Sequence, residues 1–132
     1  DIEVLSQYAN SFTDSAKAKV IAKQMKNNGA DIIFTACGGG NVGVIETARE
    51  EKDIKIIGVD MPMSYMSPEY IITSALKNVG EGLKLTIKDT LEGNFNGGKE
   101  VKYDLSHNGV GYEKTDLLSD EVIEFVDKKI EK

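Results

Sequence analysis

Two charged residues at the ends of predicted strands could together bind a ligand. Asp60 ends one apolar, strand-like run, and Lys77 directly follows the next. Because consecutive parallel strands end at the same edge of a sheet, we expect both side chains to face one crevice. A carboxylate that accepts hydrogen bonds beside an ammonium that donates them suits a pair of neighbouring hydroxyl groups. The alternative is an ordinary surface ion pair, which would contribute little to stability.

A glycine run forms the second candidate site, because it follows a buried-looking strand and opens a helix. Gly38, Gly40 and Gly43 match the spacing G-x-G-x-x-G, and Asp60 ends the next predicted strand. This arrangement is typical of a dinucleotide site, in which a pyrophosphate binds the helix N-terminus and the acid binds a ribose. In such sites, however, the glycine strand is usually the first, whereas here a complete strand and helix precede it. The simpler interpretation is that the glycines only make the turn and allow close packing.

Phe12 lies in a polar loop after the first predicted strand. Its ring could stack on a base or sugar, or it could cover the helix that follows, and the sequence leaves both interpretations open. Cys37 and His107 are each the only residue of their type, so no disulfide, metal-ligand cluster or Ser-His-Asp triad is expected. Because no nucleophile lies beside an activating base, the sequence favours binding over catalysis and predicts neither a metal nor a cofactor.

The composition is that of a single soluble domain. The chain has 132 residues, a net charge of −6 and a pI near 4.8. An acidic chain does not favour a nucleic-acid polymer as partner, because phosphate binding needs a basic face. No apolar run approaches the roughly 20 residues of a membrane-spanning helix.

The elements that position these residues alternate along the chain. Strands are expected at residues 2–8, 32–36, 54–60 and 70–76, with an edge strand at 100–105. Helices are expected from a cap at Thr13 or Asp14 to Gly29, at 42–52, from a cap at Asn78 to Leu91, and at 119–131. The uniformly apolar run 32–36 predicts a strand covered on both faces. This order predicts an α/β fold with a mostly parallel sheet, helices on both faces, and one compact lobe.

Four short motifs occur in order along the chain: Gly29–Phe34 with the Gly38-Gly39 turn, Ile57–Asp60, Thr73–Val79 and Asn108–Tyr112. Together they resemble the basic membrane protein (Bmp) family. Its members are bacterial surface lipoproteins that act as substrate-binding proteins of ABC transporters, and they include purine nucleoside receptors. The resemblance implies the type I periplasmic-binding-protein fold, with two α/β lobes that close on a ligand. Residues 1–132 resemble only the C-terminal lobe, so we expect a fragment of a two-lobe protein.

The resemblance also implies a role for each candidate residue. Phe12 would stack on a purine, Asp60 and Lys77 would hold the ribose hydroxyls, and Gly38 and Gly39 would let the ligand approach the backbone. The implied partners are a purine nucleoside or similar ribose-bearing molecule, the missing N-terminal lobe and an ABC permease. The implied location is extracytoplasmic, with a lipid anchor outside this chain. No enzymatic activity is implied.

One departure and two alternatives accompany this interpretation. Met61-Pro62-Met63 follow Asp60, whereas family members often have Val-Asp-Gln there, so the exact ligand stays open. A dinucleotide-binding fragment of an NAD-dependent oxidoreductase is the main alternative. A flavodoxin-like or receiver-like signalling domain is disfavoured, because no cluster of acids is expected where the strands end.

Overall fold

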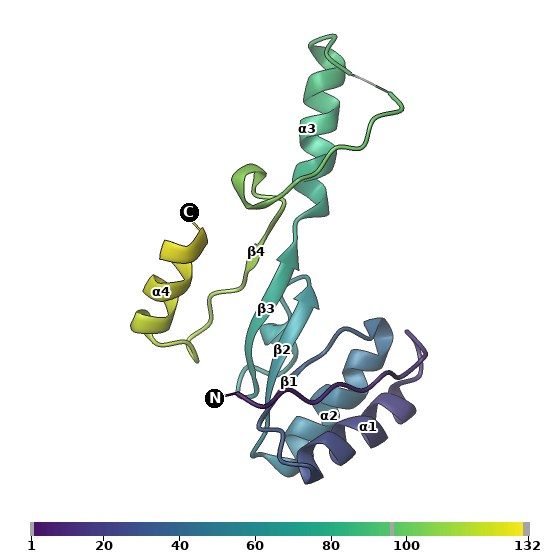
Figure 1. Cartoon of the computed structure of the whole chain (residues 1–132), viewed down its shortest axis with the longest axis vertical. Helices are drawn as coiled ribbons and strands as arrows, with labels where there is room; N and C mark the ends of the chain where they lie inside the picture. Colours follow the sequence, from purple (N-terminus) through teal and green to yellow (C-terminus); the bar gives the residue numbers. More distant parts are fainter. Residues whose placement is uncertain (1, 96, 131–132) are drawn as a thin grey trace.

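The computed structural model describes residues 2–95 and 97–130. In these residues strands and α-helices follow in the order α1 (Ser15–Asn27), β1 (Ile32–Phe34), α2 (Asn41–Glu51), β2 (Lys55–Asp60), β3 (Ile71–Lys77), α3 (Val79–Leu91), β4 (Val110–Tyr112) and α4 (Asp120–Ile130). The sheet has the order β1-β2-β3-β4, in which the first three strands are parallel and β4 is antiparallel to β3 (Figure 1). The predicted α/β fold with a mostly parallel sheet is therefore confirmed.

Helix α1 begins and ends where its sequence predicts. The Asp14 carboxylate accepts a hydrogen bond from the Lys17 N–H at 2.9 Å, which satisfies one of the free donors at the helix start. Gly29 then turns the chain with a φ of +97°, a conformation that other residues rarely adopt. Ala18 and Ala22 are buried on the inner side of the helix, facing the core.

Helices α1 and α2 pack together over one face of the sheet, and the core lies beneath them. Its buried members are Ala18, Ala22, Ile33, Val44, Ile45, Ala48, Ile54, Ile56, Met63 and Ile71. The small alanines of α1 allow α2 to come close. On the opposite face of the sheet, Ile32 and Phe34 remain 47% and 57% exposed.

The prediction for the strand that precedes the glycine turn is therefore wrong in two respects. The strand is shorter than residues 32–36, and its burial alternates exposed, buried, exposed. Only Ile33 faces the helical layer. The apolar run is typical of a strand covered on both faces, but α1 and α2 cover only one face of β1. Apolar character alone therefore does not predict burial here.

Residues 2–9, where a strand was predicted at 2–8, form no strand. They cross the part of the molecule that holds β1 and α1 in the view of Figure 1, and residues 7–9 border, together with these elements, a groove of about 510 Å³. Within the described part of the chain, no backbone hydrogen bond joins this segment to the sheet. Ile2 and Val4 are almost fully exposed, so nothing covers the outer side of the segment and holds it against β1.

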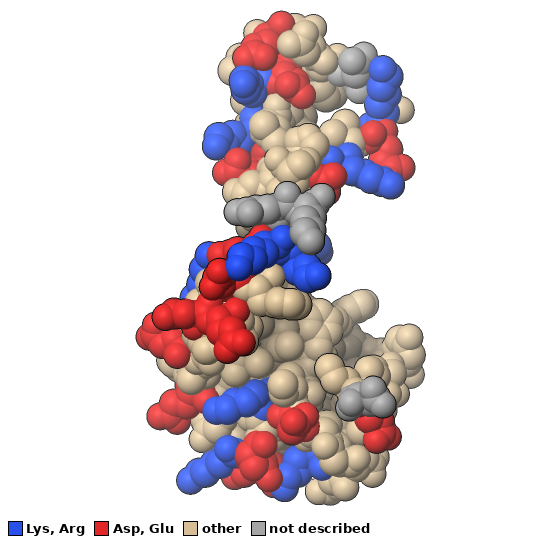
Figure 2. Space-filling view, turned by 60° about the vertical axis from the view of Figure 1, so that its left-hand side comes forward, with Lys and Arg blue, Asp and Glu red and all other residues tan. Residues whose placement is uncertain are grey.

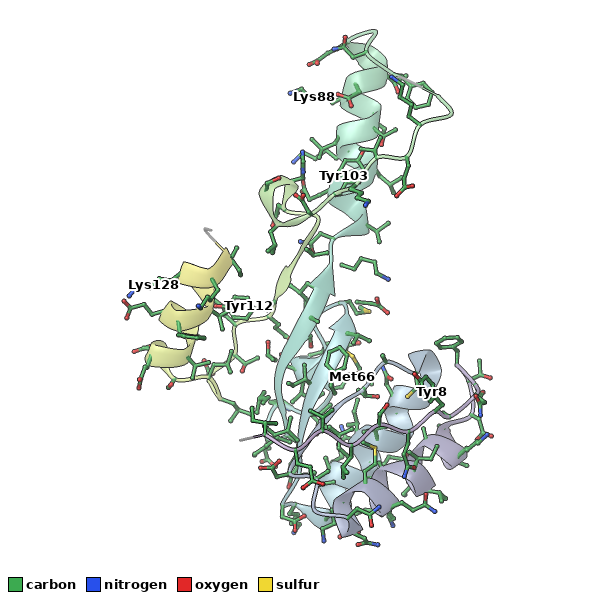
Figure 3. All side chains as sticks on the ribbon, viewed as in Figure 1. Tyr8, Met66, Lys88, Tyr103, Tyr112 and Lys128 are labelled. Carbon is green, nitrogen blue, oxygen red and sulfur yellow. The ribbon has the colours of Figure 1, made fainter. Side chains whose placement is uncertain are left out.

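Helix α3 extends away from the sheet and is followed by a segment that returns to β4 (Figure 1). This extension differs from the single compact lobe that was expected. The ends of the extension are joined, because the Asn78 N–H donates to the Gly109 carbonyl at 2.8 Å and its side-chain amide donates to the Asn108 carbonyl at 2.8 Å. The predicted edge strand at 100–105 is absent from the described residues. Tyr103 lies instead against α3, where its hydroxyl bonds to that of Thr86 at 2.9 Å (Figure 3).

Helix α4 is attached to the body through polar contacts. Ser119 caps it as predicted, since its hydroxyl accepts from the Val122 N–H at 3.3 Å, while Glu131 lies outside the described residues. The Tyr112 side chain points toward α4 (Figure 3), where its hydroxyl donates to Asp127 at 2.7 Å, and Lys114 pairs with the same carboxylate at 2.7 Å. Burial and the neighbouring Asp127 charge raise the pKa of Tyr112.

Candidate ligand-binding site

Asp60 and Lys77 meet at the edge where the parallel strands end. Asp60 is the last residue of β2 and Lys77 the last of β3, and the two strands pair so that Asp60 lies opposite Leu76. The Asp60 Oδ1 atom lies 2.8 Å from the Lys77 Nζ atom, with the two side chains 60% and 65% exposed. So exposed a pair contributes little to stability, because water and salt screen it. Both groups are accessible to a ligand.

The backbone of Asp60 is strained. Its φ is +69°, and the Met61 N–H donates to the Val59 carbonyl at 2.9 Å. A hydrogen bond that spans three residues with a positive φ at the central one is a rare and costly γ-turn. Such strain persists only where surrounding contacts hold it, and it is concentrated at functional sites. The residue type does not indicate this strain, because glycine is the usual residue in this conformation.

Phe12 and the glycine turn form the second part of the site. The Phe12 ring is 74% exposed, while its carbonyl oxygen lies 2.9 Å from where a Cβ on Gly38 would be and 3.4 Å from that position on Gly39. Gly38 also has a φ of +57°. The space that these glycines leave is therefore occupied by the backbone of Phe12. The predicted approach of a ligand to the same turn stays a prediction.

The rest of the glycine pattern is explained by packing inside the chain. A Cβ on Gly43 would lie 2.9 Å from the Ser15 carbonyl carbon and closer still to its oxygen, so this glycine lets α1 approach α2. The buried Asn41 side chain accepts hydrogen bonds from the Thr35 hydroxyl at 2.8 Å and the Cys37 N–H at 3.0 Å. The spacing that resembles a dinucleotide fingerprint thus has a structural cause.

Glu113 is a site-adjacent residue that the sequence did not single out. It follows β4 and reaches the loop after Asp60, where its Oε2 atom accepts from the Met63 N–H at 3.1 Å and the Ser64 N–H at 3.3 Å. The hydroxyls of Ser74 (2.7 Å) and Ser64 also donate to it. Partial burial disfavours the charged carboxylate, but these hydrogen bonds outweigh burial and lower the pKa of Glu113.

Arg49 of α2 holds the other end of this loop. Its guanidinium donates to the Ser67 hydroxyl at 3.0 Å and to the Met66 carbonyl. Met63 and Ser67 are both buried, so the loop is anchored by packing as well as by charge. Neither Glu113 nor Arg49 belongs to a motif, because their partners are backbone groups and serine hydroxyls that lie far away in the sequence.

Neither charge dominates the face drawn in Figure 2, where acidic and basic side chains are interspersed over the body and over the α3 end. In the described ranges, no three His, Cys, Asp or Glu side chains gather as a metal site. Among the same residues, no helix combines the length and the apolar character needed to cross a bilayer.

Comparison with known proteins places this geometry in a family. Residues 1–132 match the model of the PnrA-like ABC transporter substrate-binding proteins, Bmp. The chain belongs to the Bmp family. It is 42% identical over 114 residues to basic membrane protein A of Borreliella afzelii, with 85% of the chain covered, and 39% identical over 132 residues to basic membrane protein B of Borreliella afzelii (strain PKo), with 98% covered. It spans only 35% and 38% of these two relatives.

Solved structures agree with the family assignment. An ABC transporter solute-binding protein from Aeropyrum pernix K1 superposes with a TM-score of 0.75 at 28% identity, over 98% of this chain and 34% of that one. A protein described as a transcriptional activator of the comK gene from Bacillus halodurans gives a TM-score of 0.85 at 25% identity, over 95% and 44% of the two chains. The fold of the Bmp chain therefore also occurs in a protein that carries a different functional description.

The predicted site residues fall into two groups at one edge of the Bmp chain. Phe12 packs against Gly38 and Gly39 after β1, and Asp60 contacts Lys77 where β2 and β3 end. Because β1 pairs with β2 and β2 with β3, both groups belong to the same edge. One group presents a flat apolar ring and the other a hydrogen-bond acceptor beside a donor, and the groove lined by Phe12 includes neither Asp60 nor Lys77.

Proposed function

We propose that this chain is the C-terminal lobe of a bacterial ABC-importer substrate-binding protein, and that it binds a purine nucleoside or similar ribose-bearing molecule. The observation that carries the proposal is the exposed Asp60–Lys77 pair at 2.8 Å. Its carboxylate can accept, and its ammonium donate, hydrogen bonds to neighbouring hydroxyls. The exposed Phe12 ring offers a surface for a base. The protein is a binding protein in this proposal, not an enzyme.

The ligand would be enclosed by an N-terminal lobe outside this chain. Helix α3 supports this part of the proposal, because it presents an apolar row that is 59–83% exposed and consists of Val79, Leu83, Ile87 and Leu91. Monomeric proteins seldom leave so large an apolar surface uncovered. Since the Bmp relatives are more than twice as long as the chain, we assign this row to the interface with the other lobe.

The proposed location is outside the cytoplasm, where a substrate-binding protein delivers its ligand to an ABC permease. A lipid anchor attached outside these residues would hold it at the membrane. Closure of two lobes by a hinge motion would remove water from Asp60 and Lys77 and strengthen their hydrogen bonds to the ligand. The chain by itself should therefore bind weakly.

Calorimetric titration of the full-length protein with inosine, guanosine, ribose and NAD tests the proposal. Tight binding of a nucleoside with no response to NAD is expected. Tight binding of NAD without any nucleoside binding would favour a dinucleotide site and overturn the proposal.

A pair of variants, one at each end of β2 or just beyond it, tests the hydroxyl clamp. Asp60→Ala should weaken nucleoside affinity about 10- to 150-fold, which corresponds to the roughly 1.5–3 kcal/mol of a hydrogen bond to a charged group. Asp53→Ala is the matched control, because Asp53 lies just before the other end of β2, is 61% exposed and also pairs with a lysine. The nucleoside affinity of Asp53→Ala should equal that of wild type. An effect of Asp60→Ala below threefold would contradict the clamp.

A further inference from the structure

We propose that Glu113 is a positioning residue for the binding site: it ties the loop of residues 61–67 to β3 and thereby holds Asp60 against Lys77. The inference rests on the proposed function only for its ligand-binding part. Its structural part, that Glu113 fixes the orientation of Asp60, can be tested without any ligand.

The contacts of Glu113 join the two segments that carry the clamp. Its carboxylate accepts from the N–H groups of Met63 and Ser64, which follow Asp60 by three and four residues. It also accepts from the hydroxyl of Ser74, which lies on β3 three residues before Lys77. One carboxylate thus connects the loop after Asp60 to the strand that ends in Lys77.

The backbone of Glu113 is itself fixed to β3. Its N–H donates to the Ser74 carbonyl at 2.9 Å, and its carbonyl accepts from the Thr73 hydroxyl at 2.7 Å. The backbone from which the carboxylate extends is therefore fixed to β3. The Ser74 hydroxyl, also on β3, holds the carboxylate itself at 2.7 Å.

Packing transmits this anchoring to β2. A Cβ on Gly58 would lie 2.7 Å from the Ser74 hydroxyl and 2.8 Å from the Met63 sulfur, so Met63 and Ser74 press directly on the strand that leads to Asp60. The Met63 N–H also donates to the Ser74 hydroxyl at 3.1 Å. Ser74 and Met63 are both buried, which leaves them little freedom to move.

The strained turn at Asp60 explains why such an anchor is needed. A γ-turn with a φ of +69° can relax once the residues after it are released. Relaxation would rotate the Asp60 carboxylate away from Lys77. Anchoring of Met63 and Ser64 only three and four residues later opposes that movement.

The test uses Glu113→Gln in the full-length protein, with Glu69→Gln as matched control. Both changes remove one carboxylate near the same loop, but the exposed Glu69 side chain makes no hydrogen bond or ion pair within the described residues. The first readout is the ¹³C chemical shift of the Asp60 carboxyl at neutral pH, together with amide exchange in residues 61–67. We expect Glu113→Gln to move the shift and to speed exchange at least tenfold, while Glu69→Gln changes neither.

The second readout is the affinity for inosine. Glu113→Gln should weaken it about tenfold at unchanged stoichiometry, and Glu69→Gln should leave it within twofold. If Glu113→Gln proves unfolded, Ser64→Ala removes one donor to the same carboxylate and should produce smaller changes of the same sign.

The outcomes separate the two proposals. An unmoved Asp60 shift in a folded Glu113→Gln protein would overturn the positioning role, whatever the ligand results show. Faster loop exchange with unchanged inosine affinity would also overturn it, because Glu113 would then act on stability alone. Failure of the wild type to bind any nucleoside would count against the proposed function, and the carboxyl shift would still decide the role of Glu113.

Discussion

Gly43→Ala tests whether the glycine pattern serves packing or ligand binding. Gly43 is the third residue of α2, and a Cβ there would lie 2.9 Å from the Ser15 carbonyl carbon and 3.0 Å from the Lys19 nitrogen. Its separation from the Ser15 oxygen would be smaller again. All three atoms belong to the backbone of α1, so no side chain can rotate out of the way. The two helices would have to move apart.

The net effect follows from two opposing contributions. Overpacking of this kind costs about 1–3 kcal/mol, while replacing glycine by alanine in a helix gains about 0.5–1 kcal/mol. The variant should therefore lose up to about 2.5 kcal/mol of unfolding free energy, and about 1 kcal/mol at the centre of both ranges. With a urea dependence of about 1–3 kcal/mol per molar, a loss of about 1 kcal/mol lowers the unfolding midpoint by roughly 0.3–1 M.

Urea unfolding of the 132-residue chain, followed by far-ultraviolet circular dichroism, measures this shift. Gly80→Ala is the matched control, because Gly80 is the second residue of α3 and a Cβ there would meet nothing within 4 Å. The urea midpoint of Gly80→Ala should equal or exceed that of wild type. If Gly43→Ala unfolded at the wild-type midpoint or above it, the packing explanation of the glycine pattern would be refuted.

Three further predictions follow from strain, charge and exposure. Asp60→Gly should be more stable than Asp60→Ala by about 1 kcal/mol in urea, because glycine accepts the positive φ; equal stabilities would show that the turn is unstrained. Glu113→Gln should be about 1–2 kcal/mol less stable than wild type at pH 7. This difference in unfolding free energy should be complete above the ordinary pKa of 4.5 and should shrink as the pH falls through the lowered pKa of Glu113. A difference that stays constant from pH 7 to pH 3 would contradict a role for the ionised carboxylate. Leu83→Asp should change the stability of the 132-residue chain by less than about 0.5 kcal/mol, because Leu83 is exposed there. The same change should destabilise the full-length protein by more than about 1 kcal/mol, because Leu83 would lie in the proposed lobe interface. Equal effects in both proteins would argue against that interface.

The fold was predictable where local signals and burial agree. The Asp14 cap, the Gly29 stop and the alternation of strands and helices gave α1, α2 and the parallel strands close to their observed bounds. Prediction failed at residues 2–8 and 100–105, where strand-like patterns remain unpaired among the described residues. A strand needs a neighbour that supplies hydrogen bonds, and no local pattern states whether that neighbour is present.

The candidate site was predictable only in its exposed part. Asp60 and Lys77 follow from the rule that parallel strands end at one edge, and their 2.8 Å separation agrees with it. Glu113 and Arg49 were missed because they act on backbone groups and serine hydroxyls distant in sequence. The positive φ of Asp60 was missed because it comes from the turn and its anchors, not from the residue type.

In the proposed function, the groups that would contact the ligand differ from the groups that support them. The glycines and Glu113 act within the protein, through close approach and hydrogen bonds to partly buried partners. Phe12, Asp60 and Lys77 are largely exposed, so replacing them should leave the fold intact. The same exposure limits what they can do alone, because hydrogen bonds and charges in contact with water add little net affinity. A site with rigid support and open binding groups therefore gains strength only when a second surface excludes water, which is the role that the proposed function gives to the other lobe.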